Sequence, residues 1–482
     1  MTLPVERLFI AGQTVETDQK VDLYNPAKLS EKVGECYLGT VEHVNQAVEA
    51  AERAWPEWAD TPAEQRAQYL LEMAQYIDDN TEELSRLLVL EHGKILREAV
   101  IDLKSAAAAL RYYATLHTEL KDKVVENEQG TMILTRQPVG VVSVIVPWNF
   151  PIILAVHMLA PSLVAGNTVV IKPPTYVPLT ITRILNHIAK RLPAGVLNVI
   201  PGSGSTVGAA MVEHPRVRKV AFTGSTETGR DIMRKAAGTI KKISMELGGN
   251  DAAILLPDVT VNDHLIDETI AASYTACGQI CYAMKRIYVY RDHYENFVKR
   301  FTEAADKIVV GFGLDPEVTM GAINNKPQYE SVLKLIEEAK QTGATVKEVG
   351  RLSDKVSRDQ GYFILPHIVT DVDNRHPIVQ EEQFGPVIPI LPYDTIDEAI
   401  KMANDTEYGL ANSIWTADIE KGFKLARRLQ SGSVFINTHK VGASAANMPF
   451  GGFKQSGIGR GHGVEALYEH TELQAIIRRI DM

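Results

Sequence analysis

Two cysteines stand four residues apart in the segment 277–281, Cys-Gly-Gln-Ile-Cys. A cysteine is a nucleophile once its thiol has lost its proton, and helix N–H groups nearby would favour that loss. Cys281 lies in a turn-like segment outside any apolar stripe, which makes it a candidate nucleophile. Two other interpretations stay open: Cys277 and Cys281 could form a redox pair, or each could be an inert core residue.

Glu246 and Asn149 are two further candidates for chemistry. Glu246 stands between apolar residues in the segment 245–249, Met-Glu-Leu-Gly-Gly. A carboxylic acid in an apolar cleft has a raised pKa and can act as a general base, although a paired structural carboxylate is the alternative. Asn149, in the segment Pro-Trp-Asn-Phe-Pro, has an amide that could hold an oxyanion. A simple turn between two prolines explains that segment as well.

Several segments carry groups that suit a nucleotide. Gly224 and Ser225 open a helix in FTGSTETG, and the free N–H groups of that helix could hold a pyrophosphate. PGSGSTVG, which contains Gly202, is a second junction of strand, glycine and helix, and two junctions are more informative than one. Lys172 could reach a ribose or a phosphate, and Glu382 could bind ribose hydroxyls. Both could also be ordinary solvated side chains.

Short β-branched runs separated by helical segments must position these residues. The runs cover 141–146, 168–171, 197–200 and 220–223, and the helical segments cover 151–165, 178–192, 205–212 and 226–237. Strands and helices that alternate at this spacing predict a doubly wound parallel sheet. Ligands of such sheets bind outside the carboxyl ends of the strands, directly where the candidate residues stand.

The rest of the chain predicts further elements. Apolar runs near 252–256, 286–290, 387–391, 413–415 and 433–436 indicate a second α/β domain, with the break near Gly248 and Gly249. Residues 43–117 read as consecutive helices, one of them started by Thr61 as a capping residue with Glu64 three residues later. A polar stretch followed by an alternating one predicts a hairpin before residue 139. The glycine-rich segment near 450–460 should form a loop over a cleft.

Composition excludes several classes of protein. The chain has 482 residues, of which 45% are hydrophobic and 23% charged, as in ordinary globular proteins of two or three domains. Its formal net charge is −10 and it has no long basic run, so we expect no nucleic-acid or membrane partner. Three cysteines suit neither a disulfide framework nor a structural zinc site, and we expect no metal. The amino terminus lacks a signal-peptide pattern, which favours a cytoplasmic location.

Taken in order, these motifs resemble the aldehyde dehydrogenase superfamily over nearly the whole chain. The motifs that carry the resemblance are YNPA, PWNFP, KPPT, GSTETG, ELGG, GQIC, EEQFGP and PFGG. The resemblance implies a Rossmann-type parallel-sheet cofactor domain, a second α/β catalytic domain and a small β oligomerisation arm. It assigns residues 1–118 and 139–248 to the first, 249–449 to the second, and 119–138 with 468–482 to the arm. Residues 450–467 would close over the cleft.

The resemblance also implies a mechanism. The Cys281 thiolate attacks an aldehyde, the Asn149 amide holds the oxyanion, and hydride passes to a nicotinamide cofactor. Glu246 then activates water to hydrolyse the thioester. The residues that this places against NADP or NAD are Trp148, Lys172, Thr175, Gly202, Gly224, Ser225, Gly229, Leu247, Glu382 and Phe384.

Four positions depart from the pattern of the superfamily. Thr175 replaces a frequent glutamate that would repel a 2′-phosphate, so NADP should be accepted and even preferred. Ala276 and Asn250 replace a frequent asparagine and lysine. Gly461 replaces a glutamate thought to assist water activation in some members, so Glu246 would act without it.

The superfamily's substrate tunnel maps onto a mixed lining. Its residues are Phe150, Leu154, His157, Ile280, Tyr282, Ser444 and Phe450. Ile280 stands where a phosphorylated substrate would need an arginine, which disfavours phosphorylated trioses. A small hydroxy-aldehyde, a semialdehyde and an aromatic aldehyde stay open, and the arm predicts a homodimer or a homotetramer.

Three rival functions remain on the sequence. A non-catalytic relative has no need for Cys281, Glu246 and Asn149 together. A cysteine hydrolase has no need for a phosphate site at Gly224 and Ser225. A coenzyme A-acylating member generally lacks the glutamate that this chain has at position 246.

Overall fold

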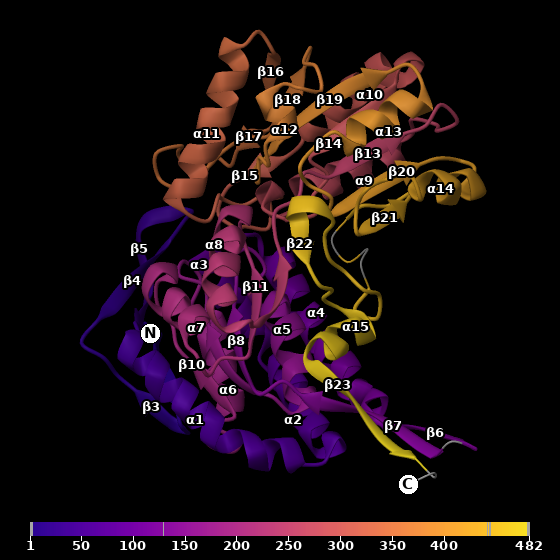
Figure 1. Cartoon of the computed structure of the whole chain (residues 1–482). Coiled ribbons are helices and arrows are strands. Elements are labelled where there is room, and N and C mark those ends of the chain that lie inside the picture. The colour runs from indigo at the N-terminus through magenta and orange to yellow at the C-terminus, as the bar shows by residue number, and fades with distance from the viewer. Residues whose placement is uncertain (1–2, 129, 441, 443–444, 480–482) are drawn as a thin grey trace.

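Two mostly parallel sheets and a small antiparallel sheet organise the chain. The computed structural model describes residues 3–128, 130–440, 442 and 445–479. In the view of Figure 1 the second sheet lies at the top, the first sheet below it, and the small sheet at the bottom right beside the carboxyl terminus. The alternation of strands and helices that the sequence predicts is therefore confirmed.

The first sheet has eight strands in the order β22-β12-β11-β8-β9-β10-β2-β3. Its five central strands, β12 to β10, are parallel, and the outer strands are antiparallel to their neighbours. The strands are β2 (Leu8–Ile10), β3 (Gln13–Val15), β8 (Val141–Ile145), β9 (Thr168–Lys172), β10 (Leu197–Val199), β11 (Lys219–Thr223), β12 (Lys242–Glu246) and β22 (Gly457–Ile458).

Helices cover both faces of this sheet because successive strand residues point to opposite sides. In β8, Val142 and Val144 pack on one side and Val141 and Ile145 on the other. The first side is covered by α2 (Ala63–Asp79), α3 (Thr81–His92), α4 (Leu96–Thr115), α5 (Pro151–Ala165) and α6 (Leu179–Ala189). The second is covered by α1 (Val41–Asp60), α7 (Ala209–Glu213), which follows a π-helical turn at Gly204–Gly208, and α8 (Thr226–Ala236).

The predicted capping box at Thr61 is wrong. Helix α2 begins at Ala63 without a side-chain cap, and the Thr61 hydroxyl donates to the carbonyl of Glu57, 2.9 Å away. The threonine therefore ends α1 instead of starting α2, because the two helices are separated by only two residues and the last carbonyls of α1 compete for its hydroxyl.

The second sheet has seven strands in the order β16-β18-β19-β14-β13-β20-β21, and only β16 is antiparallel to its neighbour. The strands are β13 (Ala252–Leu255), β14 (Arg286–Tyr290), β16 (Thr345–Glu348), β18 (His367–Thr370), β19 (Val387–Tyr393), β20 (Ala411–Trp415) and β21 (Ser433–Ile436). The helices of this half are α9 (Asp263–Tyr274), α10 (Arg291–Ala305), α11 (Lys326–Gln341), α12 (Pro377–Gln380), α13 (Ile396–Asn404) and α14 (Ile419–Ala426). A two-stranded sheet pairs β15 (Val309–Val310) with β17 (Arg351–Leu352).

The predicted hairpin forms, and the carboxyl-terminal tail adds to it. β6 (Lys123–Asn127) and β7 (Gly130–Pro138) are antiparallel, and β23 (Thr471–Arg479) pairs with β7 along its whole length. A last helix, α15 (Gly463–Glu469), precedes β23. Near the amino terminus, β1 (Val5–Glu6), β4 (Lys20–Asn25) and β5 (Lys28–Tyr37) form a separate sheet.

The glycine-rich tail is not purely a loop. Its short strand β22 extends the first sheet beside β12, and Phe450 and Gly461 form an isolated bridge. None of the helices in the described part of the chain combines the length and the apolar character that a membrane span requires.

Candidate functional site

The carboxyl ends of five parallel strands open into a cavity of about 410 Å³, named here the strand-end cavity. It is lined by residues that follow β8, β9, β10, β11 and β12 and by residues of the second half of the chain. Eight of the ten residues predicted to hold a cofactor lie on its wall: Trp148, Lys172, Thr175, Gly224, Ser225, Leu247, Glu382 and Phe384. Gly204, which stands in the glycine-rich segment PGSGSTVG, also lines it. Gln328 and Ser331 line it as well, and the sequence did not point to them.

The two other glycines lie behind that wall. Gly204, not Gly202, lines the cavity after β10, and the buried Gly202 turns its carbonyl toward Lys172. Gly229 is buried in α8 against Leu247. Neither glycine lines the cavity, because the spacing of glycines shows where a turn is and not which of its residues faces the cavity.

Lys172 and helix α8 supply positive charge to the strand-end cavity. The Lys172 side chain is buried and its Nζ donates to the carbonyls of Pro173 (2.9 Å) and Gly202 (3.2 Å). Burial lowers the pKa of this lysine to about 8. Ser225 caps α8 by accepting from the Thr228 N–H, which leaves other N–H groups of the first turn beside the cavity. A helix amino terminus of this kind attracts a phosphate.

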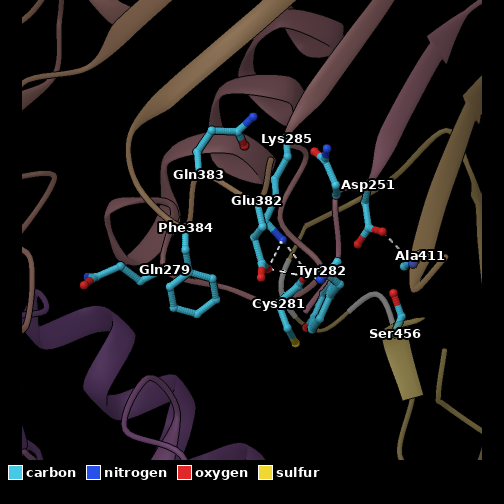
Figure 2. Close-up of polar contacts among 12 residues, drawn as sticks. Asp251, Gln279, Cys281, Tyr282, Lys285, Glu382, Gln383, Phe384, Ala411 and Ser456 are labelled. Atoms are coloured by element: carbon cyan, nitrogen blue, oxygen red, sulfur yellow. Dashed lines mark hydrogen bonds and ion pairs between the residues drawn. The ribbon is translucent and has the colours of Figure 1, made fainter. Parts of the chain in front are cut away.

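Glu382 is fixed at the other side of the strand-end cavity. Its carboxylate accepts from the Gly249 N–H at 3.1 Å and pairs with the Lys285 ammonium at 3.1 Å. Lys285 also donates to the carbonyl of Cys281, so one lysine connects the glutamate to the cysteine loop, as Figure 2 shows. The sequence did not indicate a role for Lys285. Glu382 is far from it in the chain, and its other partner is a backbone carbonyl, which every residue has.

A second cavity, of about 260 Å³ and named here the inner cavity, lies on the other side of Cys281. The residues predicted for the substrate line it, namely Phe150, Leu154, His157, Ile280, Tyr282 and Phe450. Ser444, the seventh, lies outside the described residues. The sequence missed one whole wall, which α4 provides through Ile101, Ser105 and Ala108, and it missed His462. These residues stand in ordinary helical or glycine-rich patterns that carry no chemical signature.

Cys281 and Asn149 line both cavities. Cys281 stands in a turn after the short 3₁₀ helix Thr275–Gly278, so the predicted help from N–H groups at a helix start is wrong. Burial raises the pKa of its thiol to about 12, although the Lys285 ammonium opposes this. The resting side chain is thus a thiol, and attack requires a base. Cys277 is buried within the 3₁₀ helix, and burial also raises its pKa.

Glu246 ends β12 and reaches the inner cavity. Burial raises the pKa of its carboxyl to about 7, and the Arg460 guanidinium partly counteracts the effect. Gly461 lies against it so closely that a Cβ at position 461 would collide with Glu246 Oε1. The missing side chain at 461 therefore leaves the room in which the Glu246 carboxyl sits.

Asn149 is held by one hydrogen bond of its side chain and one of its backbone. Its side-chain Nδ2 donates to the carbonyl of Gln279 at 3.0 Å, which uses one of its two amide hydrogens. Its own backbone carbonyl accepts from Lys94 Nζ at 2.8 Å. The second amide hydrogen stays available for a ligand oxygen at the junction of the cavities.

Buried charges at the start of α4 support both the Asn149 loop and the cysteine loop. Lys94 is fully buried and pairs with Asp102 at 3.5 Å, and Asp102 accepts from the Ile153 N–H at 2.9 Å. Glu98 accepts from the Ala276 N–H at 2.7 Å, just before the cysteine loop. One helix thus holds the segments that carry Asn149 and Cys281 in a single arrangement.

Comparison with known proteins places this arrangement among relatives of known class. The profile described as "Aldehyde dehydrogenase family" matches residues 13–476. A phenylacetaldehyde dehydrogenase from Pseudomonas fluorescens is 36% identical over 98% of this chain and 95% of its own length.

Two solved structures share the fold across nearly all of both chains. A betaine aldehyde dehydrogenase from Staphylococcus aureus in complex with NAD+ has a TM-score of 0.95 and 34% identity, covering 99% of this chain and 95% of that one. An aldehyde dehydrogenase from Bacillus cereus in an NAD+ complex has a TM-score of 0.93 and 36% identity, covering 99% and 97%.

Replacing Lys94 with Met should destabilise the protein by about 3–5 kcal/mol, because it leaves the buried Asp102 without its cation. Chemical denaturation measures the loss. Lys104→Met is the matched control: Lys104 lies on α4, as Asp102 does, in an exposed pair with Asp78, and its loss should cost less than about 1 kcal/mol. Equal losses for the two variants would contradict a structural role for the buried pair.

Proposed function

Because this chain belongs to the aldehyde dehydrogenase family, we propose that it oxidises an aldehyde to the carboxylic acid with NADP or NAD as hydride acceptor. The observation that carries the proposal is the position of Cys281 and Asn149 at the junction of the two cavities. A nucleotide in the strand-end cavity and an aldehyde in the inner cavity would meet at that sulfur.

Cys281 Sγ bonds to the aldehyde carbon in the first step. The carbonyl oxygen becomes an alkoxide, which the free Asn149 amide hydrogen stabilises. The thiol must lose its proton during attack, since burial keeps it protonated at rest. Glu246 is a carboxylate on the same cavity whose pKa lies near neutrality, and we assign this proton to it.

Hydrolysis follows oxidation. The bound nicotinamide supplies a hydride acceptor, and loss of hydride leaves a thioester on Cys281. Glu246 first releases the thiol proton to solvent and then takes a proton from water. The resulting hydroxide attacks the thioester carbon, the carbon–sulfur bond breaks to release the acid, and the proton on Glu246 returns to the Cys281 sulfur. The presence of Glu246 favours water over coenzyme A as the acceptor of the acyl group.

The strand-end cavity suits a dinucleotide. The start of α8 at Ser225 would bind the pyrophosphate, Glu382 a ribose, and Trp148 and Phe384 the flat nicotinamide, since their rings pack at 5.5 Å beside Cys281. Thr175 is exposed at the wall close to Lys172, with no carboxylate to repel a 2′-phosphate. We propose that NADP is accepted and preferred, with NAD as the alternative that relatives bind.

The domain roles follow from the same arrangement. We assign residues 1–118 and 139–248 to cofactor binding and 249–449 to catalysis. The arm formed by β6, β7 and β23 exposes Leu473, Ile476 and Ile477 at a sheet edge. Such an edge favours pairing with a second copy, so we propose a homodimer or a dimer of dimers.

Cys281→Ala should abolish aldehyde oxidation, because Cys281 is the only thiol in the described lining of the inner cavity. Glu246→Gln removes the base of both steps, so it should slow the first turnover of cofactor reduction and lower steady turnover by at least about 100-fold. Stopped-flow absorbance at the reduced-nicotinamide band separates burst from steady state. Cys277→Ala is the control and should keep both phases; steady turnover by Glu246→Gln at the wild-type rate would assign the base elsewhere.

Steady turnover should fall as the pH drops through about 7, the pKa of Glu246, since only the carboxylate form accepts a proton. Arg460→Gln should move this midpoint to higher pH, because the guanidinium lowers the pKa of Glu246. A kcat profile between pH 5.5 and 9 measures both. A flat profile in the wild type would exclude Glu246 as the limiting base.

Thr175→Glu should lower kcat/KM for NADP by about 10-fold or more and leave NAD nearly unchanged, because a carboxylate there repels the 2′-phosphate. Thr175→Gln matches the size without the charge and should keep NADP use. Initial rates with both cofactors give the comparison. Equal losses for Glu and Gln would show that position 175 acts through size alone.

A further inference from the structure

Positive charge is absent from the described lining of the inner cavity. None of the lining side chains that the structure describes is a lysine or an arginine. The three residues near position 444 that lie outside the described residues are Val441, Ala443 and Ser444, which carry no charge by type. Burial lowers the pKa of His462 to about 3 and that of His157 well below its usual value, so both rings are neutral. A carboxylate on a substrate would therefore find no cation to pair with among the described lining side chains.

Asp102, one of the two acids of the lining, is not free to bind a substrate cation. Asp102 is already paired with Lys94 and bonded to the Ile153 N–H. Lys94 Nζ also lies 3.9 Å from the centre of the Phe150 ring, so one face of that ring already holds a cation. A substrate ammonium against the other face would meet the field of this buried lysine.

Flat rings form one continuous wall of the cavity. Tyr282 packs edge to face with Phe450 at 5.5 Å, and Phe450 stacks on His462 at 5.2 Å. His462 in turn stacks on His157 at 3.6 Å. A ring in the substrate could extend this stack, and the volume of about 260 Å³ suits one ring and not a long polyene.

We propose that the inner cavity selects an uncharged aldehyde with a single aromatic ring and rejects both carboxylate-bearing and ammonium-bearing aldehydes. This inference rests on the proposed function. It narrows the three substrate classes left open by the sequence to one, because a semialdehyde brings an unpaired charge and a small hydroxy-aldehyde leaves the ring wall unfilled.

Matched pairs of aldehydes test the charge. We expect kcat/KM for 4-formylbenzamide to exceed that for 4-formylbenzoate by at least 100-fold, since the two differ in charge and hardly in shape. 3,3-Dimethylbutanal should exceed its isostere betaine aldehyde by at least 10-fold. Phenylacetaldehyde should exceed glycolaldehyde by at least 10-fold. A charged member that equals its neutral partner, or glycolaldehyde as the best substrate, overturns the proposal.

Binding separates this inference from the proposed function. If no aldehyde reduces either cofactor, the proposed function fails, but calorimetric affinities of the same compounds for Cys281→Ala still report on the cavity. Neutral members that bind more tightly than their charged isosteres would support the inference. Equal or reversed affinities would overturn it.

A new cation should change the selectivity. Ser105→Lys places an ammonium on the α4 wall and should raise the ratio of 4-formylbenzoate to 4-formylbenzamide kcat/KM at least 10-fold. Ser105→Met adds length without charge and should leave that ratio near the wild-type value. An unchanged ratio in Ser105→Lys, or the same change in both variants, would show that charge in the lining does not set the preference.

Discussion

The ammonium of Lys94 is fully buried, so neighbouring groups must compensate its charge. The groups that do so also position the candidate site. The partners of Lys94 are the Asp102 carboxylate and the backbone carbonyl of Asn149. Asp102 in turn holds the Ile153 N–H at the start of α5. Because removal of any partner leaves a charge uncompensated, the position of the Asn149 loop is coupled to the stability of the helical layer. Glu98, one turn before Asp102 on α4, is also buried, and it accepts a hydrogen bond from the Ala276 N–H in the segment that leads to Cys281.

The two cavities differ in electrostatic character, and Cys281 stands between them. The strand-end cavity brings together a buried lysine, a helix amino terminus and the Lys285–Glu382 pair. The inner cavity has neutral rings and apolar side chains. The proposed dinucleotide, which is anionic, and the proposed uncharged aldehyde would thus each be matched to one cavity. The same burial that makes the inner cavity apolar raises the pKa of the thiol, which is why the reaction needs a base close by.

In the proposed mechanism Glu246 is that base, and its position depends on the absence of a side chain at residue 461. Gly461 lies where any Cβ would collide with its carboxyl oxygen, so the carboxylate can sit back against the tail strand. Arg460, the neighbour of this glycine, keeps the pKa of Glu246 near 7 against the effect of burial. The sequence shows a glycine at position 461 where the superfamily often has a glutamate. In the structure this glycine leaves room for the carboxyl of Glu246, the proposed base.

Local pattern and residue type determined a large part of this protein from its sequence alone. Runs of β-branched residues at regular spacing predicted the parallel strands, and parallel strands must end at one edge, which brought Asn149, Lys172 and Gly224 together. Only the tertiary structure decided which residues line the cavities and which side chains hold them in place. Gly204 and not Gly202 lines the strand-end cavity, Ser105 of α4 lines the inner cavity, and Lys285 pairs with Glu382. The tertiary structure also decided that Thr61 ends α1 and does not start α2. Periodicity and chemical type are properties of neighbouring residues, whereas distances between segments far apart in the chain arise only when the core packs.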